Sequence, residues 1–593
     1  MPADPPSLVV EAVGSGAAEQ AETSVKKTKV QALLPFAIIS ISYLLFTVTD
    51  GAIRMIVLMH AYSQGFSAME VATMFTLYEL AGVVTNLVAG FAGAKLGIKC
   101  TLLTGLALQL VSYGLLFAWP AVVAAGEQAC GSRAGVIAFV TVAQMFGGIA
   151  KDLTKLGGKS VTKLVTPADK STRLFRLVSL LTGWKNSLKG VGYFLGSALI
   201  DVQYELALWT MMVLIVAALA VAALGLDRKL GTASKKNARF KDVFLTNNPN
   251  LNWLSLARCF LFASRDFWFE VPLPFFLRSP ICNGLGHTPC DNHAQCEPGA
   301  LCLAHLAFNA SDGLATSGIG LDAASVGSDD TIVCLAPPPV PANASAAGLC
   351  ANLNVGGGCG GLGWSRMITG AVLAGYIILY GQCQSYTPQL VTGPLKQTPP
   401  NQLTEVLWGA INCLPTALMA GIALAYSLPP SATDATSDFE LAVWLVGTVI
   451  VFALIFAVNS SIHSFLVVHY AKHDKLATSV GFYYMSNAVG RLLGTLGSGV
   501  LYTYAGEQRG PYAGSDNRRG LGACFIAGTL SSVLAAAITL KIRDEAAGLR
   551  CGPCVCVGAA EKEETSRTSD REPAPAPAAE PAGAEEVVEV GKV

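Results

Sequence analysis

Charged residues are scarce in this sequence. Of its 593 residues only 13% are Asp, Glu, Lys or Arg, whereas ordinary soluble domains contain roughly 25%. Hydrophobic residues make up 52%, and several stretches of twenty residues contain no charge at all. The forty basic and forty acidic residues cancel, so the net charge gives no indication of a nucleic-acid partner. The composition excludes an ordinary soluble enzyme and predicts an integral membrane protein.

Recognisable catalytic and targeting motifs are absent as well. No nucleotide-binding motif and no catalytic constellation at a usable spacing appears, so neither an enzyme nor a cofactor is expected. The first thirty residues lack a basic start followed by an apolar core, which excludes a signal peptide. Residues 1–30 are therefore expected to form a disordered cytoplasmic tail.

Apolar runs long enough to cross a hydrocarbon core of ~30 Å as a helix occur twelve times. The expected organisation is a first six-helix half, 31–226, a cytoplasmic central loop, 227–250, and a second six-helix half, 251–541. The runs of the first half lie near 33–58, 67–92, 101–124, 134–156, 175–199 and 206–226. Those of the second half lie near 251–275, 365–388, 404–428, 438–468, 477–503 and 521–541.

Basic residues gather in the connections on one side of these spans, the side that also holds the N-terminus. Because Lys and Arg near helix ends stay cytoplasmic, both termini are expected in the cytoplasm of a multi-pass protein of the plasma membrane. The C-terminal segment 542–593 contains eleven acidic and six basic residues. Its Ala/Pro/Glu-rich composition predicts a disordered acidic tail.

A long insertion, 278–363, falls between the seventh and eighth spans, on the side that this topology makes external. It contains glycosylation sequons at Asn309 and Asn343. Cysteine-dense sequence of this kind is typical of an oxidising compartment, where disulfides stabilise a segment too small for a core. A zinc site is the weaker alternative, because His287 and His293 accompany no CxxC motif. The candidate disulfide cysteines are Cys130, in the loop after the third span, and Cys282, Cys290, Cys296, Cys302, Cys334, Cys350 and Cys359.

Charged residues inside the spans carry most of the functional information, because such residues are costly and usually face a protein interior or a watery cavity. His463 is interpreted instead as a hydrogen-bonded interior histidine rather than a proton relay. The candidate substrate-binding bases are Arg54, Lys151, Lys185, Lys189, Arg258, Arg265 and Arg491. The candidate proton-coupling or ion-pairing acids are Asp50, Glu79, Asp152, Asp266 and Glu270.

The third helix of each group of three contains no charged residue, through 101–124, 206–226, 407–428 and 521–540. This period matches a bundle in which each half is two three-helix repeats with the third helix outside. The connection between the second and third spans, GFAGAKLGIK, resembles the loop signature of the major facilitator superfamily in Gly90, Lys95, Gly97 and Lys99; Ala94 replaces its usual acid. An all-α membrane protein of twelve helices with this fold is predicted.

The intramembrane bases outnumber the acids, seven to five. Asp50 and Arg54 are four residues apart and share a helix face on which they can pair, and Lys185 and Lys189 share a face likewise. The surplus of positive charge predicts an anionic substrate, and the planar guanidinium of arginine suits carboxylate or phosphate-type oxyanions. The alternative for each pair is a structural ion pair that only fixes helix packing.

Five blocks of the sequence resemble the ArsJ-type organoarsenical efflux permeases, a branch of the major facilitator superfamily. The resemblance covers roughly 31–277 and, more loosely, 364–541. The insertion, the acidic tail and the N-terminal extension depart from it. The blocks are Thr49-Asp-Gly-Ala-Ile-Arg-Met, Tyr78-Glu-Leu-Ala-Gly-Val-Val-Thr-Asn-Leu, Gly148-Ile-Ala-Lys-Asp-Leu, Thr182-Gly-Trp-Lys-Asn-Ser-Leu-Lys-Gly-Val-Gly and Ala257-Arg-Cys-Phe-Leu-Phe-Ala-Ser-Arg-Asp.

The resemblance implies export of 1-arseno-3-phosphoglycerate and hence arsenate resistance. It also implies a functional link to glyceraldehyde-3-phosphate dehydrogenase, which makes this ester when it uses arsenate in place of phosphate. Proton antiport is expected, because buried acids are present and a nucleotide-binding motif is absent. Two alternatives stay open: efflux of another organic anion or a drug-like solute, and a non-transporting membrane sensor.

Overall fold

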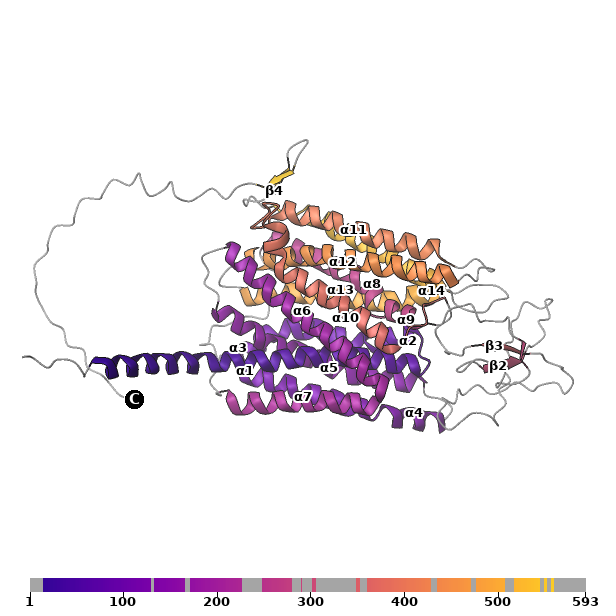
Figure 1. Cartoon of the computed structure of the whole chain (residues 1–593), viewed down its shortest axis with the longest axis horizontal. Coiled ribbons are helices and arrows are strands. Elements are labelled where there is room, and N and C mark those ends of the chain that lie inside the picture. The colour runs from indigo at the N-terminus through magenta and orange to yellow at the C-terminus, as the bar shows by residue number, and fades with distance from the viewer. Residues whose placement is uncertain are drawn as a thin grey trace, which may run out of the picture.

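The computed structural model is a bundle of long helices that lie roughly parallel to one another (Figure 1). Short strands lie outside the bundle. The structure describes residues 14–128, 133–165, 171–226, 248–279, 360–427, 435–470, 476–506 and 517–543, together with the strand segments 289–290, 301–304, 348–351, 549–551 and 556–558.

The helices follow the predicted spans closely. Those of the first half are α1 (Gly14–Ser63), α2 (Ala68–Met74), α3 (Thr76–Phe117), α4 (Trp119–Gln128), α5 (Arg133–Val165), α6 (Ser171–Val202) and α7 (Tyr204–Gly225). Those of the second half are α8 (Pro249–Phe269), α9 (Pro272–Arg278), α10 (Arg366–Thr387) with the π-helical turn η4 (Pro388–Thr392), α11 (Gln402–Ala425), α12 (Ala435–Tyr470), α13 (Leu476–Gly506) and α14 (Asn517–Thr539).

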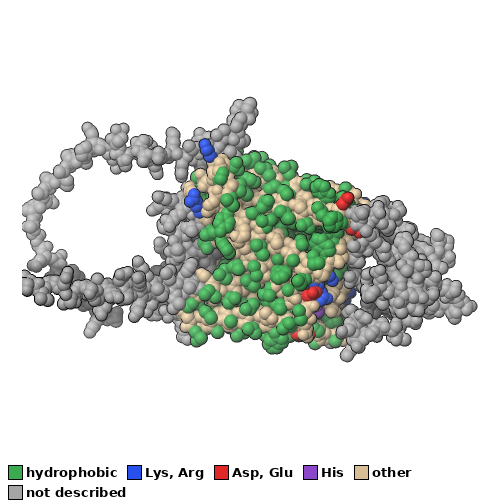
Figure 2. Space-filling view, viewed as in Figure 1, with side chains coloured by type: hydrophobic (Ala, Val, Ile, Leu, Met, Phe, Trp, Pro, Cys, Tyr) green, Lys and Arg blue, Asp and Glu red, His purple; other side chains and the backbone are tan. Residues whose placement is uncertain are grey.

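Eight helices of the described residues are long and apolar enough to cross a membrane. Four further segments of the described residues also cross the bundle: the first part of α3; α6; α8 with α9; and α13. They contain charged residues that are buried, namely Glu79, Arg258, Asp266 and Glu270, or partly exposed, namely Lys185 and Arg491. On the face in view, hydrophobic side chains are spread over the whole bundle, and the charged side chains lie near its two ends (Figure 2). This is the surface expected of a multi-pass membrane protein.

Two spans are combined in α3, because no residue between Thr76 and Phe117 leaves the helical conformation. A Cβ added at Gly82 would lie 3.1 Å from Asp152, and one at Gly105 would lie 2.4 Å from Thr154. In a straight helix these two glycines would be about 35 Å apart at 1.5 Å per residue. Since both contact the same turn of α5, the chain reverses between them, and the connection with the predicted loop signature is helical.

The helix α1 begins at Gly14, within the segment 1–30 that the sequence assigns to a disordered tail, and this part of α1 projects beyond the bundle (Figure 1). Ala, Glu, Gln and Lys, which favour helix, predominate there. In the insertion, β1 (Pro289–Cys290), β3 (Gly348–Ala351) and β2 (Leu301–Ala304) form an antiparallel sheet in that order, with Cys302 opposite Cys350. The strands β4 (Leu549–Cys551) and β5 (Cys556–Gly558) pair after the last helix.

The two halves meet along two pairs of helices, α6 with α10 and α3 with α13. In contrast, α7, α11 and α14 expose large apolar side chains, among them Val213 at 63%, Leu414 at 67% and Leu530 at 60%. These are the sixth, ninth and twelfth spans, which the sequence predicts to be outermost. The inner helices bury polar and charged side chains against one another.

Candidate functional site

Arg54, towards the C-terminal end of α1, joins the two halves of the bundle. Its Nη2 donates to Glu79 Oε1 of α3 at 2.9 Å, and its Nη1 donates to Glu270 Oε2, at the end of α8, at 2.7 Å. The guanidinium lies 4.7 Å from the centre of the Tyr78 ring. All three charged side chains are at most 3% exposed, so this is a buried contact between the halves.

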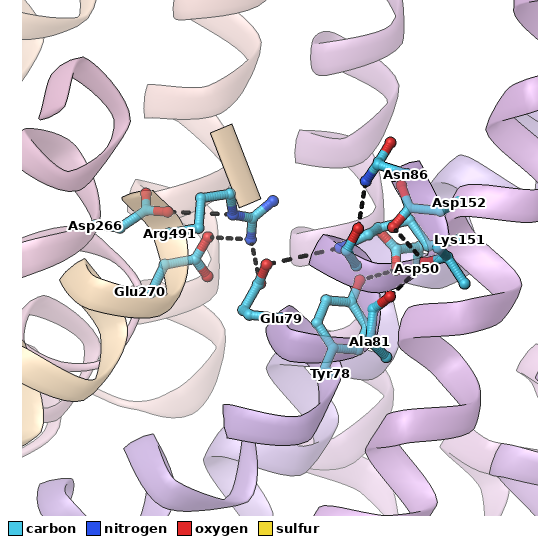
Figure 3. A network of polar contacts seen from close by, with 12 residues as sticks. Asp50, Tyr78, Glu79, Ala81, Asn86, Lys151, Asp152, Asp266, Glu270 and Arg491 are labelled. Atoms are coloured by element: carbon cyan, nitrogen blue, oxygen red, sulfur yellow. Dashed lines mark hydrogen bonds and ion pairs between the residues drawn. The ribbon is translucent and has the colours of Figure 1, made fainter. Parts of the chain in front are cut away.

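Arg491 of α13 contacts the same two acids from the other side. Its Nη2 lies 2.8 Å from Glu79 Oε1 and 3.0 Å from Glu270 Oε1, and its Nε lies 3.2 Å from Asp266 Oδ2. Figure 3 shows Arg491 between Glu79 on one side and Asp266 and Glu270 on the other. Arg54, Glu79, Glu270 and Arg491 thus form a closed set of four ion pairs, here called the cross-half ring.

Three bases of this region, Lys151, Arg265 and Arg491, are more exposed than the acids, whereas Arg54 is buried with them. The side chains of Glu79, Asp266 and Glu270 are 0–2% exposed, whereas those of Arg265 and Arg491 are 12% exposed and that of Lys151 is 17% exposed. Arg265 Nη2 pairs with Asp266 Oδ1 at 2.6 Å. The acids therefore form a buried layer behind cations that retain access to solvent or a ligand.

Further cations extend from α5. Lys151 Nζ lies 3.8 Å from Glu79 Oε2 and 4.0 Å from the centre of the Tyr78 ring. One turn further on, Lys155 pairs with Asp152 at 3.4 Å and lies over the Tyr484 ring of the second half. Lys155 is absent from the residues predicted from the sequence, although its spacing of four from Lys151 places both on one helix face.

Lys185 and Lys189 lie on one face of α6, and both are partly exposed. Among the described residues, no carboxylate oxygen lies within 4 Å of either ammonium group. Lys189 Nζ is 5.5 Å from the centre of the Tyr193 ring. The charges of Asp50, Lys151 and Arg491 act on Lys185, so these lysines face the same interior region as the cross-half ring.

Asp50 and Arg54 do not form the pair that their spacing allows. Tyr78 donates its hydroxyl to Asp50, while Arg54 extends to Glu79 and Glu270. Helical spacing brings two side chains to one face, but the partners available on neighbouring helices decide which contacts form. The prediction that each of these residues lies in the interior agrees with their burial of 94% or more.

Arg258 also has a different environment from Arg265, seven residues away on the same helix. Its guanidinium stacks 3.9 Å from the Phe262 ring centre, and its Nε donates to Asn487 at 3.2 Å. Its Nη1 donates to Ser460 Oγ of α12 at 3.4 Å. Arg258 therefore belongs to a second buried cluster, the Arg258 cluster, which consists of Arg258, Glu405, Asn459, Ser460 and His463.

Glu405 of α11 is a buried acid that the sequence does not single out, because it lies at the very start of a span whose charge-free stretch begins at 407. Its side chain is 2% exposed, and its Oε1 lies 2.9 Å from His463 Nε2. The charges of the two regions can now be counted separately. We call the ring together with the interior charged residues around it on α1, α3, α5, α6, α8 and α13 the cross-half region. It contains seven bases and five acids, because Lys155 takes the place of Arg258 in the predicted set. The Arg258 cluster contains one base and one acid.

Several predicted residues lie elsewhere or cannot be placed. Lys99 donates to Ala223 O at 2.8 Å and also to Leu226 O, so it caps the end of α7. Gly90, Lys95 and Gly97 lie within α3, but their surroundings fall outside the described side chains. Asn309, Asn343 and the cysteine side chains of the insertion, with Cys130, also lie outside them. In the described part of the chain no three His, Cys, Asp or Glu side chains are placed to hold a metal ion.

Comparisons with known proteins identify the fold. No family model and no curated protein sequence matches the chain. It resembles a bacterial homologue of the iron transporter ferroportin, with 10% identity over 85% of this chain and 98% of that chain. The TM-score is 0.50 for the outward-facing state of that homologue and 0.51 for its inward-facing state. It resembles the nucleoside transporter NupG at 0.50, with 12% identity over 86% and 100%.

These structures and the helix arrangement confirm the predicted fold class. The chain is a multi-pass membrane protein whose helix bundle has the fold of these transporter structures. At 10–12% identity the likeness shows the fold alone, so function must be argued from the residues of the site.

Proposed function

We propose that this protein is a secondary active transporter that exports a small organic anion, and that its substrate is 1-arseno-3-phosphoglycerate. The observation that supports an anion is the pair Lys185 and Lys189, two interior cations on one helix face without a carboxylate within 4 Å among the described residues. A substrate that brings two negative charges would balance the surplus of two bases in the cross-half region.

The magnitude of this surplus favours a multiply charged ligand. Two opposite charges 4 Å apart attract by about 4 kcal/mol at an effective dielectric constant of ~20, so two lysines beside a dianion supply enough to replace part of its hydration. Arg491 and Arg265 stand nearby with 12% exposure, and their planar guanidinium groups suit phosphate and carboxylate oxygens. An uncharged solute would leave both lysines uncompensated.

The helix contacts support alternating access. We call the end of the bundle that flanks residues 280–359 the insertion end and the opposite end the tail end. At the insertion end the Tyr62 and Phe275 rings meet across the halves at 5.1 Å, and at the tail end the Phe175 and Phe465 rings meet at 5.3 Å. Both ends are in contact, as in the occluded state through which a rocking carrier passes.

The choice of the arsenical rests on the resemblance to ArsJ-type permeases. The blocks that carry the resemblance contain Arg54, Glu79, Lys151, Lys185 and Arg265, and these residues surround the cross-half region in the structure. Under this proposal both termini are cytoplasmic and the ester is produced by glyceraldehyde-3-phosphate dehydrogenase inside the cell.

The test is expression in an arsenate-sensitive host with and without glyceraldehyde-3-phosphate dehydrogenase. Arsenate resistance and loss of cell arsenic that both require this enzyme support the arseno-ester. Resistance that is independent of the enzyme contradicts it. Transport of other organic anions without any effect on arsenic would favour the broader alternative, and an absence of flux for any anion would favour a sensor.

A further inference from the structure

Glu405 and His463 form a buried acid–imidazole pair away from the cross-half ring. The carboxylate is 2% exposed and the imidazole 1% exposed, and Glu405 Oε1 lies 2.9 Å from His463 Nε2. With its amide nitrogen turned towards the carboxylate, Asn459 donates to Glu405 Oε2 at 3.1 Å. No Arg or Lys side chain of the described residues lies within 4 Å of this carboxylate, unlike those of Glu79, Asp266 and Glu270.

The surroundings of the pair contain one permanent charge. Arg258 of α8 is the only described residue whose charge acts appreciably on either group. Tyr483 of α13 and Tyr380 of α10 are the nearby titratable hydroxyls, and α14 contributes the uncharged Ser532. Arg258 is itself held by Asn487 and Ser460, so the negative charge of Glu405 is compensated only across an intervening layer.

Counting protons shows what the pair can bind. With one proton, His463 Nε2–H donates to the carboxylate and the pair carries one negative charge. With two protons the pair is neutral, either as carboxylic acid and imidazole or as carboxylate and imidazolium. Nδ1 carries a hydrogen in the imidazolium form and wherever the acid donates its proton to Nε2. A buried carboxylate without a directly bonded cation is costly, which favours uptake of the second proton.

The second nitrogen links this uptake to conformation. His463 Nδ1 is buried and has no hydrogen-bond partner. A hydrogen on Nδ1 would be an unsatisfied buried donor, which costs about 1–3 kcal/mol. The two-proton forms with a hydrogen on Nδ1 are therefore disfavoured in the present conformation and favoured in any conformation that gives Nδ1 an acceptor. A ligand that binds two conformations differently shifts the balance between them.

We propose that Glu405 and His463 are the proton-binding site that couples this carrier to the proton gradient, a role that rests on the proposed transport function. The acids that the sequence favours for this role have other tasks: Glu79 and Glu270 bridge the halves, and Asp266 holds Arg265 and Arg491. Asp50 accepts a hydrogen bond from Tyr78, and its charge acts on both Lys185 and Lys189; it has no ion pair within 4 Å among the described residues.

A chain of hydrogen bonds runs from α6, the helix that holds Lys185 and Lys189, to α12, the helix that contains His463. Asn186, beside Lys185 on α6, donates to Gln384 Oε1 of α10 at 2.7 Å. Gln384 Nε2 donates to Ser460 Oγ at 3.3 Å, the same oxygen that Arg258 contacts. Ser460 and His463 lie one turn apart on α12. The chain Asn186–Gln384–Ser460 thus joins α6, α10 and α12, whose relative motion transport would require.

The first arm of the test needs no substrate. Infrared difference spectra of the full-length protein in lipid, recorded between neutral and mildly acidic pH, should show protonation bands of a carboxyl or an imidazole. Glu405→Gln and His463→Gln should each remove them, whereas Glu70→Gln, which changes a partly exposed carboxylate at the insertion end, should not. Wild-type spectra that match both variants would overturn the proposal.

The second arm uses proteoliposomes and radiolabelled 3-phosphoglycerate, which keeps the 3-phosphate of the arseno-ester and carries a free carboxylate where the ester carries its arsenate. Glu405→Gln should retain exchange of this probe at equal pH and lose its acceleration by a pH gradient. A variant that still responds to the gradient as wild type does would contradict coupling at this pair. Wild-type protein that does not move the probe would count against the proposed function, while the infrared arm would still decide the proton site.

Discussion

At the scale of residues, the interior cations of this protein fall into two kinds. Arg54 touches two buried carboxylates and Arg491 touches three, whereas Lys185 and Lys189 touch none within 4 Å among the described residues. Breaking a buried ion pair leaves an uncompensated charge and destabilises the fold. Removing a cation that has no paired acid carries no such cost. The two kinds should therefore respond in opposite ways to neutralisation.

Neutralising the lysines should impair transport and spare stability. Lys185→Gln and Lys189→Gln are each expected to lower anion efflux at least tenfold, about 1.4 kcal/mol of lost binding, with no fall in the melting temperature of the purified protein. Arg133→Gln is the matched control, because this base is 50% exposed and pairs with Glu70 at the insertion end. Full efflux by both lysine variants would contradict an anion site on α6.

Neutralising a ring arginine should affect stability first. Arg491→Ala removes the cation that Glu79, Glu270 and Asp266 share, and we expect the free energy of unfolding to fall by about 3–5 kcal/mol. Adding Glu79→Gln should recover part of this loss, because the double variant removes one of the stranded charges. Thermal denaturation of the two single variants and the double variant measures the coupling; additive losses would mean that the two residues do not interact.

The sequence identifies most of these residues and few of their partners. Intramembrane charge is rare enough that each instance stands out, which explains why Arg54, Glu79, Glu270 and Arg491 can be named in advance. Which acid meets which base depends on helices hundreds of residues apart in the chain. Glu405 escapes notice because a charge at the start of a span resembles an ordinary interfacial residue.

At the scale of elements, close helix packing holds the halves together. A Cβ added at Gly183 of α6 would lie 2.2 Å from the carbonyl oxygen of Gly381 on α10, and one at Gly381 would lie 2.4 Å from Ser187 Oγ. Such distances require small residues on both helices, as in other membrane helix pairs. The backbones of the two halves are therefore in near contact beside Asn186 and Gln384.

A single methyl group should disturb this contact. Gly381→Ala is expected to reduce transport and to lower the melting temperature, since backbone atoms of α6 have no room to withdraw without moving the helix. Gly375→Ala on the same helix is the control, because a Cβ there meets nothing within 4 Å. Equal transport and equal melting temperatures in these two variants would show that the close approach is unimportant.

The agreement between predicted spans and helices differs from one element to the next. α7 and α14 coincide with their apolar runs within a few residues, because hydrocarbon thickness sets the length of a lipid-facing helix. α3 does not, since the predicted loop between its two spans is helical. Local helix preference can continue through a turn that only the packing of both arms against α5 produces.

At the scale of the whole molecule, the enclosed site implies that one end must open. At the tail end, Ser179 Oγ of α6 lies 2.6 Å from Ser461 Oγ of α12, so the two halves touch there directly. Contacts at each end must break in turn for a substrate to cross.

Locking the tail end should stop transport. A double variant, Ser179→Cys with Ser461→Cys, places two sulfurs near the ~2.05 Å separation of a disulfide. Oxidation is expected to abolish efflux and a reductant to restore it, while each single cysteine variant stays active under both conditions. Mass spectrometry would show whether the oxidised double variant is fully cross-linked. If it is fully cross-linked and still active, alternating access at this end is contradicted.

The sequence by itself determines that this is a twelve-span membrane protein with scarce, interior and predominantly basic charge, because lipid tolerates charged side chains only where protein encloses them. Tertiary structure alone decides how that charge is divided. It pairs Arg54 and Arg491 with acids of both halves, leaves Lys185 and Lys189 without a carboxylate within 4 Å in the described part of the chain, and assigns Arg258 to a cluster with Glu405. Helical periodicity specifies a face, but the partner on that face comes from helices that only folding brings together.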